Sequence, residues 1–570
     1  MPPAEKNRLA RLVDALRAPT WIARIVALVG LITLLSALSP EIRYRAHLIA
    51  ELVPSGFPAA ATTGAAAVGI LLLALSRALR RGKFRAWLLA TVLSLVAAAL
   101  NVLKGLDIEE AALSVALFVL LLSARRNFTA KPDPRSLQRL AAVVVLGPVV
   151  ASLAGWAWLN LDPEDQAPGT TQLDRYVQAL LGLVGLPGPI TFTTPAHATH
   201  AATGLLVLGA AVALTALLVA LQPAGGPSHL TDEDRARLRA LLDRWGRIDS
   251  LSYFALRDDR SAMFSASGKA AVTYRVVGTV SLAAGDPIGD PEAWPGAITE
   301  WLTEARSFGW VPAVIGASER AAEAYHRVGM DALELGDEAI VHVDEFSLEG
   351  RSMRAVRQAV SRCERAGLTV ACHRVGDLDH DRVLQMAELA DDWRDGEVER
   401  GFSMALGRFG DAADDQAVVV TATDAEGDLR GLLHFVPWGS DGLSLDLMRR
   451  DRTSENGIVE QMVAGLMAAA PGLGVKRVSL NFAVFRSVFA RGERLGAGPV
   501  LRLWRSLLLV ASRFWQIESL YRANAKYQPE WVPRFVCFRS SADLPRVGVA
   551  GLRAEAFLVA PGWVRRLTRP

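Results

Sequence analysis

The stretch AATGLLVLGAAVALTALLVALQPAGGPSHLTDEDRARLRALLDRW, residues 201–245, divides the chain into two parts that suit two different solvents. Residues 201–221 are apolar and uncharged, which is typical of a helix that crosses a bilayer. Residues 223–227 (PAGGP) favour a hinge, and residues 228–231 offer N-cap side chains for a helix running to about Trp245. The stretch therefore predicts a membrane part followed by a soluble part.

The composition supports this division. The 570 residues are 51% hydrophobic, the mean hydropathy is +0.24, and nearly all long uncharged runs lie before about residue 222. A spanning helix needs about 20 predominantly apolar residues. The six segments that come close to this length are Trp21–Leu38, Phe57–Leu75, Ala86–Leu103, Ile108–Ala124, Leu140–Leu159 and Ala201–Leu221. We therefore expect a polytopic α-helical membrane domain of about six spans in residues 1–222.

The charges of the loops orient these spans. Basic residues gather before the first span, between the second and third, and between the fourth and fifth, whereas the alternate loops carry little net positive charge. The positive-inside rule then places both termini and the soluble part in the cytoplasm, as expected for a multi-pass protein of the cell membrane. The short span Ile108–Ala124 is critical, because losing it would move the soluble part to the other side. We expect the Gly/Pro-broken stretch Val177–Ile190 to be interfacial, and no cleavable signal is evident.

The soluble part alternates strands and helices in two successive α/β units. The expected strands are 271–277, 279–283, 311–315, 339–343, 369–374, 417–423, 429–437, 443–449 and 477–481. The expected helices are 292–308, 319–327, 351–366, 381–392 and 457–470. Each unit has antiparallel strands followed by a helix and another strand, so we expect a pair of similar domains, 223–348 and 349–570.

Several reaction classes lack their sequence signatures. The three cysteines fall in the soluble part with no CxxC or Cys/His metal spacing, and the nine histidines show no HExxH. No Walker pattern surrounds Gly268-Lys269. We therefore expect no metal and no cofactor.

Basic residues cluster at two places in the soluble part. Residues 475–540 hold 12 basic against three acidic residues. Five arginines recur along one predicted helix, with spacings that cover much of its circumference: Arg351, Arg354, Arg357, Arg362 and Arg365. Such clusters attract phosphates. A solvated helix face and a membrane-apposed surface are the alternative explanation.

Three separated motifs resemble one known family. They are Leu445-Asp446-Leu447-Met448-Arg449-Arg450 with Asn456-Gly457 and Glu460, then Gly285-Asp286-Pro287-Ile288-Gly289-Asp290, and Lys526-Tyr527-Gln528-Pro529-Glu530-Trp531-Val532-Pro533-Arg534-Phe535. Over roughly residues 245–560 the chain resembles the lysylphosphatidylglycerol synthases, also called multiple peptide resistance factors. It is most similar to the transferase part of the form that is fused to lysyl-tRNA synthetase.

The resemblance implies a membrane part followed by two tandem acyltransferase-like (GNAT) folds. It also implies transfer of an aminoacyl group, lysyl by preference, from aminoacyl-tRNA to phosphatidylglycerol at the cytoplasmic leaflet. The product would make the membrane more cationic and resistant to cationic peptides. The chain ends at Pro570 without a synthetase domain, so we expect a separate lysyl-tRNA synthetase as supplier, with the amino acid left open. Larger members carry an additional flippase bundle, and with six spans we do not expect lipid flipping. Homo-oligomerisation stays open.

Asp446, Arg449 and Glu460 are the expected catalytic residues. Leu443, Leu445 and Leu447 should point to one face of a strand and leave Asp446 on the other. There Asp446 would bind the substrate amino group or assist proton removal from the attacking hydroxyl, unless it only pairs with Arg450. Arg449 should face away from Asp446 unless a bulge intervenes. Glu460 would recognise a side-chain ammonium, or would simply be an acid favoured at a helix N-terminus.

Six further residues are expected to bind substrate. Lys526 and Arg534, in an otherwise irregular stretch, would neutralise a phosphate of tRNA or lipid, unless they are plain surface charges. Asn481 and Arg486 follow a strand end, where site residues are common. Arg354 and Arg357 belong to the arginine helix. Gly285, Asp286 and Pro287 are expected to form a turn between domains.

Two other functions remain open from the sequence. One is an acyl-CoA-dependent acyltransferase, although the usual Gln/Arg-x-x-Gly-x-Gly/Ala loop is missing and its nearest match is residues 493–498 (ERLGAG). The other is a non-enzymatic lipid flippase or scaffold. The predicted spans contain few charged residues, which gives this alternative little support.

Overall fold

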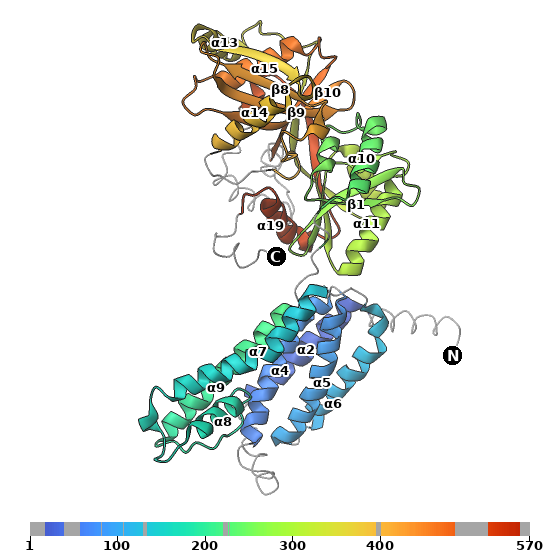
Figure 1. Cartoon of the computed structure of the whole chain (residues 1–570). Coiled ribbons are helices and arrows are strands. Elements are labelled where there is room, and N and C mark those ends of the chain that lie inside the picture. Colours follow the sequence, from blue (N-terminus) through green and yellow to red (C-terminus); the bar gives the residue numbers. More distant parts are fainter. Residues whose placement is uncertain are drawn as a thin grey trace, which may run out of the picture. The chain divides into compact units, whose positions relative to one another are not determined.

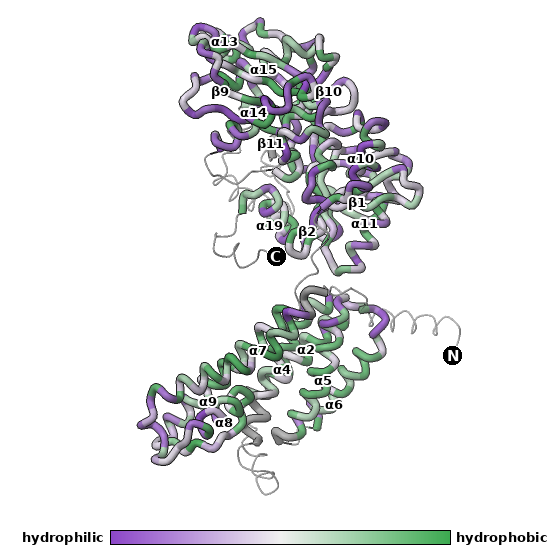
Figure 2. The backbone as a smooth tube through the Cα atoms, in the orientation of Figure 1, coloured by the Kyte–Doolittle hydropathy of each residue, from purple (hydrophilic) through white to green (hydrophobic). Residues whose placement is uncertain are grey.

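The computed structural model describes residues 18–38, 57–80, 82–105, 108–128, 134–220, 226, 229–394, 401–484 and 523–558. The chain forms two compact units that meet in sequence between Ala224 and Gly225, two residues beyond the predicted end of the membrane domain. The first unit is helical, and its helices are hydrophobic over most of their length (Figures 1 and 2). The second unit alternates hydrophobic and hydrophilic residues around a sheet.

The six predicted spans all form helices. They are α2 (Pro19–Leu38), α4 (Phe57–Leu79), α5 (Phe84–Gly105), α6 (Ile108–Ser123), α7 (Pro134–Leu159) and α9 (Pro195–Ala220). Among the described residues, the stretches with the length and polarity of a membrane span are Pro19–Ala37, Phe84–Val102, Gln138–Leu159 and Pro195–Val219. The described apolar part of α4, Gly64–Leu79, is shorter, and α6 has 16 residues. A helical membrane region is therefore present, with four clear candidate spans.

Two glycines let α2 and α4 approach closely. A Cβ atom on Gly30 would lie 2.9 Å from the Gly69 carbonyl oxygen, and a Cβ atom on Gly69 would lie 2.8 Å from the Gly30 carbonyl oxygen. Small residues are enriched at such contacts because helices in a bilayer associate mainly by close packing. The first residues of the stretch predicted to be interfacial, 177–182, belong to α8 (Gln172–Gly182), which begins with a capping box between Thr171 and Asp174.

The second unit is built on one twelve-stranded sheet. Its strands are β1 (Ser261–Phe264), β2 (Ala270–Val277), β3 (Val280–Ala284), β4 (Ile288–Gly289), β5 (Val311–Ala317), β6 (Asp331–His342), β7 (Thr369–Arg374), β8 (Val418–Thr423), β9 (Leu429–Trp438), β10 (Gly442–Arg450), β11 (Arg477–Val484) and β12 (Glu530–Phe538). The order across the sheet is β1-β2-β3-β5-β12-β6-β11-β10-β9-β8-β7, with β4 paired to β2. The predicted strands are confirmed, whereas β1, β4 and β12 were not predicted.

The helices of this unit agree with prediction to within a few residues. They are α10 (Asp232–Trp245), α11 (Trp294–Phe308), α12 (Glu319–Arg327), α13 (Arg354–Arg365), α14 (His380–Asp392), α15 (Ile458–Ala469) and α19 (Leu544–Ala554). Of these, only α19 was not predicted. The local hydrophobic period is sufficient to place these elements because each helix buries one stripe against the sheet.

The sheet repeats one arrangement twice. In the first half α11 connects the parallel strands β3 and β5, and in the second half α15 connects the parallel strands β10 and β11. Antiparallel strands precede each of these units. This repeat is the tandem organisation that the sequence predicts.

The last strand joins the two halves of the sheet. Strand β12 lies between β5 and β6, so the end of the predicted domain 349–570 sits among strands of the predicted domain 223–348. The prediction that Lys526–Arg534 is irregular is wrong from Glu530 onward. Proline is unusual inside a strand, so Pro533 argued against a strand in the sequence, yet it pairs in register with Asp337.

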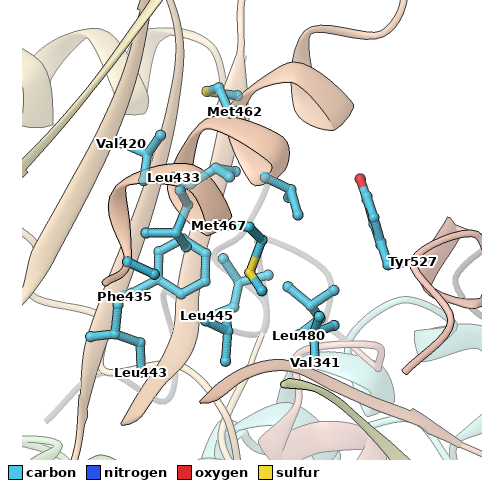
Figure 3. Close-up of a cluster of buried hydrophobic side chains, with 14 of the residues drawn as sticks. Val341, Val420, Leu433, Phe435, Leu443, Leu445, Met462, Met467, Leu480 and Tyr527 are labelled. Carbon is cyan, nitrogen blue, oxygen red and sulfur yellow. The ribbon is translucent and has the colours of Figure 1, made fainter. Parts of the chain in front are cut away.

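The core of the second half lies between the sheet and helices α13 and α15. Figure 3 shows its side chains, among them Leu433, Phe435 and Leu445 from the strands and Met462 from α15. Tyr527 contributes its ring to the same core. A smaller cluster on the other face includes Val419 and Leu432 from the sheet with Val383 and Met386 from α14. The strands of this half are therefore covered on both faces.

Candidate active site

A pocket of about 390 Å³ lies at the N-terminus of α15. Its walls come from α13, the end of β10 and the first turn of α15: Ala355, Ala359, Arg362, Arg450, Asn456, Gly457, Ile458, Val459 and Glu460. Gly457 has φ +108°, and a Cβ atom there would lie 2.8 Å from the Cβ of Ala359. Glycine is therefore required where α15 begins against α13.

The arginines of the pocket are suited to an anionic group, because the Glu460 carboxylate that also lines it is paired with Lys526. The Arg362 guanidinium donates to the Asn456 carbonyl at 3.1 Å. Arg450 lines the pocket beside it, and within the described residues neither arginine forms an ion pair with a carboxylate. The first-turn amides of α15 add partial positive charge. Guanidinium groups bind phosphate and carboxylate groups in a bidentate manner.

Glu460 and Lys526 are brought together by the fold. The Lys526 ammonium donates to Glu460 Oε1 at 2.5 Å, and both side chains are partly exposed. The Tyr527 ring lies 5.2 Å from the same ammonium. Glu460 is thus both a helix first-turn acid and a carboxylate that already binds an ammonium group. Recognition of a substrate ammonium by Glu460 stays a prediction. Lys526, expected to neutralise a phosphate or to be a plain surface charge, instead pairs with Glu460 inside the fold.

The Tyr527 hydroxyl is a buried polar group beside this pair. It has no hydrogen-bond partner among the residues that the structure describes. Burial, followed by the nearby Glu460 charge, raises the pKa of Tyr527. The hydroxyl therefore stays protonated and can only donate or accept as a neutral group.

Asp446 is buried in a bulge of β10. The pairing register with β9 shifts between Leu445 and Leu447, which leaves Asp446 as the extra residue. Its Oδ2 accepts from His434 Nδ1 at 2.7 Å and its Oδ1 accepts from the Leu406 backbone at 2.5 Å. Asp446 therefore pairs with His434, and the alternative of an Arg450 partner is wrong. Through the hydrogen bond from the Leu406 amide, Asp446 connects the segment 401–415 to the sheet.

The bulge reverses the predicted faces of the strand. Leu443 and Leu445 pack against the core under α13 and α15, but Leu447 packs with the cluster on the α14 face. The prediction that all three leucines share a face is wrong, because the extra residue shifts the alternation by one position. Arg449 lies opposite Leu432, which belongs to the α14-face cluster. Arg449 and Asp446 thus lie on one face of the sheet.

Asn481 lies at an irregularity of β11. It has φ +73°, an uncommon conformation for a residue other than glycine. The pairing of β11 with β6 shifts between Ser479 and Phe482 at this point. The Asn481 Oδ1 atom is buried and has no partner among the described residues. Such a strained residue with an unused acceptor is typical of a functional position.

Arg534 is part of a buried ionic network. Its guanidinium donates to Asp249 Oδ1 at 2.7 Å, to Glu338 Oε2 at 2.9 Å and to the Ser250 hydroxyl at 2.7 Å. Burial alone would lower the pKa of Arg534, but the two carboxylates raise it overall. The expectation that Arg534 is a surface charge or neutralises a substrate phosphate is therefore wrong, since its donors are used inside the fold.

Asp286 explains the Gly285-Asp286-Pro287 motif. Its carboxylate accepts from the Ser318 amide at 2.8 Å and from the Ser318 hydroxyl at 2.6 Å. The turn lies between β3 and β4 and holds the N-terminus of α12, so the prediction of a turn is confirmed but its expected place between domains is wrong. Burial, then the neighbouring Asp249, raises the pKa of Asp286 to about 7, although Arg534 acts in the opposite direction.

The remaining expected residues differ in accessibility. Arg354 and Arg357 are exposed on α13, and Arg357 donates to the Gly350 carbonyl at 3.2 Å. Arg486 and the residues 493–498, the nearest match to an acyl-CoA loop, lie outside the described residues.

Sequence reasoning missed three site residues. His434, Arg450 and Tyr527 had no assigned chemistry, although Arg450 and Tyr527 lie within the motifs quoted above. Proximity to a motif was a usable signal for these two. His434 offered no local signal, because its partner Asp446 is on the next strand.

Two known protein families match the chain. Residues 239–538 match the family described as "Phosphatidylglycerol lysyltransferase, C-terminal". Residues 15–221 match the "Transmembrane region of lysyl-tRNA synthetase". The two matches divide the chain where its two compact units meet.

Similar proteins span the whole chain. The "Lysylphosphatidylglycerol biosynthesis bifunctional protein LysX" of Mycobacterium avium is 45% identical over 561 residues, covering 95% of this chain and 47% of that protein. The protein of the same name in Rhodococcus jostii is 44% identical, covering 97% of this chain and 50% of that protein. The chain thus spans about half the length of these relatives.

One solved structure shares the fold of the second unit. "The structure of L-PGS from Bacillus licheniformis" superposes with a TM-score of 0.50 at 22% identity, covering 57% of this chain and 97% of that chain. At this identity the likeness concerns the fold alone.

Proposed function

The chain belongs to the phosphatidylglycerol lysyltransferase family, and from this premise we propose that it transfers an aminoacyl group, lysyl by preference, from aminoacyl-tRNA to phosphatidylglycerol. The observation that carries the proposal is the family match over residues 239–538, which contain the pocket at α15 and the β10 bulge. The transfer exchanges one ester for another. The product is a more cationic lipid, which would reduce the attraction of cationic peptides to the membrane.

We propose that the described residues perform the proton transfer that this exchange requires. The lipid hydroxyl attacks the aminoacyl carbonyl, the bond to the tRNA ribose oxygen breaks, and the proton of the attacking hydroxyl passes to the leaving oxygen. Asp446 and His434 form a buried acid–imidazole pair on the α14 face, with Arg449 on the same face. We assign proton transfer to this group. Because both Asp446 oxygens already accept hydrogen bonds, Asp446 would orient His434 for this step.

Glu460 is the residue proposed to recognise the amino acid. Its carboxylate already accepts from the Lys526 ammonium at 2.5 Å, and lysine carries an ammonium of the same kind. Exchange of one ammonium for the other would conserve the charge balance of this site. Lysyl-tRNA supplied by a lysyl-tRNA synthetase is therefore the preferred donor.

The test of the function is a lipid-labelling assay. Membranes containing the full chain receive labelled lysyl-tRNA and phosphatidylglycerol, and a positively charged labelled lipid whose formation is sensitive to ribonuclease is expected. Absence of labelled lipid with lysyl-, alanyl- and arginyl-tRNA alike would refute the proposal. Asp446→Asn, which keeps an acceptor for the Leu406 amide, should abolish product while leaving the protein folded, and full activity in that variant would remove Asp446 from the mechanism.

We also propose six spans with the second unit in the cytoplasm. The loop charges support this orientation, because basic residues dominate alternate loops. Protease added to sealed inverted membranes should digest residues 225–570, whereas the same protease should spare them in right-side-out membranes. The opposite pattern would contradict the orientation.

A further inference from the structure

We propose that the exposed arginine face of α13, together with Arg351 just before it, is a docking surface for the phosphodiester backbone of the tRNA, and that the α15 pocket receives one of its phosphates. We define the arginine face as Arg351, Arg354, Arg357, Arg362 and Arg365. The inference rests on the proposed function, and it adds where and how the nucleic acid binds.

The arginine face lies on one side of the helix. At 100° per residue the four arginines within α13 fall within an arc of about 140°. The residues on the opposite side, Val356, Ala359 and Cys363, are buried against the core. The expectation that the arginines cover much of the circumference is therefore wrong. One side of α13 must pack on the sheet, and the arginines occupy the side that remains.

These arginines lack acidic partners in the described part of the chain. All five are exposed, and within the described residues none of them forms an ion pair with a carboxylate. Their contacts are with carbonyl groups, as in Arg362 to Asn456 and Arg365 to Ser361. Elsewhere in the same unit arginines are commonly paired, for example Arg430 with Asp424 at 2.6 Å and Arg408 with Asp414 at 2.8 Å.

The local charge is strongly positive. Residues 349–366 contain the five arginines and two acids, Glu349 and Glu364. Because the second unit is not basic as a whole, with 43 basic and 47 acidic residues in 231–570, this concentration is local. A cluster of unpaired cations creates a field that attracts polyanions.

The surface connects with the pocket through Arg362. This residue belongs to the arginine face and also lines the pocket, where Arg450 lies as well. A phosphate in the pocket would meet two guanidinium groups. Neighbouring phosphates of the same strand would lie along α13, whose 12 residues extend about 18 Å. The arrangement suits a linear chain of phosphates.

The composition of the surface favours nucleic acid over a lipid bilayer. Surfaces that lie in a membrane interface combine basic residues with large apolar side chains that enter the acyl region. Among the described residues between Trp245 and Leu384, no large hydrophobic side chain is strongly exposed. The arginine face thus offers charge without an apolar anchor. Phosphate contacts from Arg and Lys supply most of the affinity in sequence-independent nucleic-acid binding.

The experiment measures tRNA binding by the full chain in nanodiscs of zwitterionic lipid. The test variant is Arg354→Gln/Arg357→Gln/Arg365→Gln. The control variant, Arg235→Gln/Arg327→Gln/Arg546→Gln, removes the same charge from ion-paired arginines elsewhere. The dissociation constant is determined by fluorescence anisotropy at several salt concentrations, and binding to vesicles containing phosphatidylglycerol is measured in parallel.

The test variant should bind tRNA at least tenfold more weakly at low salt. The slope of log K against log salt should decrease in magnitude by about 2–3, since each lost phosphate contact removes about 0.7–0.9. Arg450→Gln should reduce the slope by about one contact. The control variant should bind tRNA like the unmodified chain.

Three outcomes would overturn the inference. They are unchanged tRNA binding in the test variant, an equal loss in the control, and a loss confined to vesicle binding, which would make the face a lipid surface. Failure of the proposed function is distinguishable. If the unmodified chain makes no aminoacylated lipid, the proposed function is refuted, and the binding assay still tests whether the arginine face binds tRNA. If it makes the lipid but the test variant binds tRNA normally, only the proposal that the arginine face binds tRNA is refuted.

Discussion

Replacement of Arg534 by methionine should destabilise the centre of the sheet. The guanidinium lies between Asp249 and Glu338, and all three side chains are almost fully buried. Methionine fills similar space but leaves two carboxylates without their cation. Removing one partner of a buried ion pair costs about 3–5 kcal/mol, because the remaining charge stays in a poorly solvated place. Since every 1.4 kcal/mol is a factor of ten, local opening should become about 150- to 4,000-fold more frequent.

Hydrogen–deuterium exchange of the full chain measures this opening. Glu338 and Arg534 lie on β6 and β12. In Arg534→Met, peptides from these two strands should lose protection by a factor of about 150 to 4,000. Peptides from the membrane unit should exchange as before. Exchange reports the opening of each segment, so it does not require two-state unfolding of a membrane protein.

A surface ion pair provides the matched control. Arg546 lies 3.5 Å from Asp543, and both side chains are partly exposed. Arg546→Met should change protection by less than about 1 kcal/mol. Equal exchange in β6 and β12 for the two variants would refute the reasoning that the buried network stabilises the sheet.

Three further predictions follow from the second unit. The folded pKa of Asp286, about 7, exceeds the ~3.9 of an unfolded aspartate, so the folded state binds the extra proton and stability should fall as pH rises from about 4 to about 7. Asp286→Asn should flatten this dependence, read from the protection of the Ser318 amide after correction for intrinsic exchange. A double-mutant cycle with Glu460→Gln and Lys526→Met should give a coupling of about 1 kcal/mol in thermal stability, and additive effects would mean that the pair is not formed. Gly457→Ala should lower stability by about 1–3 kcal/mol and raise KM for aminoacyl-tRNA more than it lowers kcat, because its φ is +108° and its Cβ would enter α13.

The elements of the fold were predictable because their signals are local. The apolar run 201–221 and the hinge after it indicate the division into two units, and helical or alternating periods place most helices and strands. Motifs such as Leu445–Arg450 indicate the family without any structure. Strand β12 was not predicted, because Pro533 interrupts the residue pattern that is usual for a strand.

The site was predictable only in part. Glu460 and Lys526 were both named, but their pairing joins residues 66 positions apart. Alternation along β10 placed Leu447 on the wrong face, since a bulge depends on the pairing with β9 and leaves no fixed sequence pattern.

The sequence by itself determined the membrane part, the α/β repeat and the family, because hydrophobic period, loop charge and motif order are properties of neighbouring residues. Only the tertiary structure decided which charges stay exposed and which are paired inside the fold. Arg534 looks like a surface cation in the sequence, yet it is buried against Glu338, 196 positions away, and Asp249, 285 positions away. The arginines of α13 look similar in the sequence, yet they lie on the surface and form no ion pair with the carboxylates that the structure describes. The physical reason is that burial and ion pairing depend on the residues that folding brings into contact, and these partners are distant in the chain.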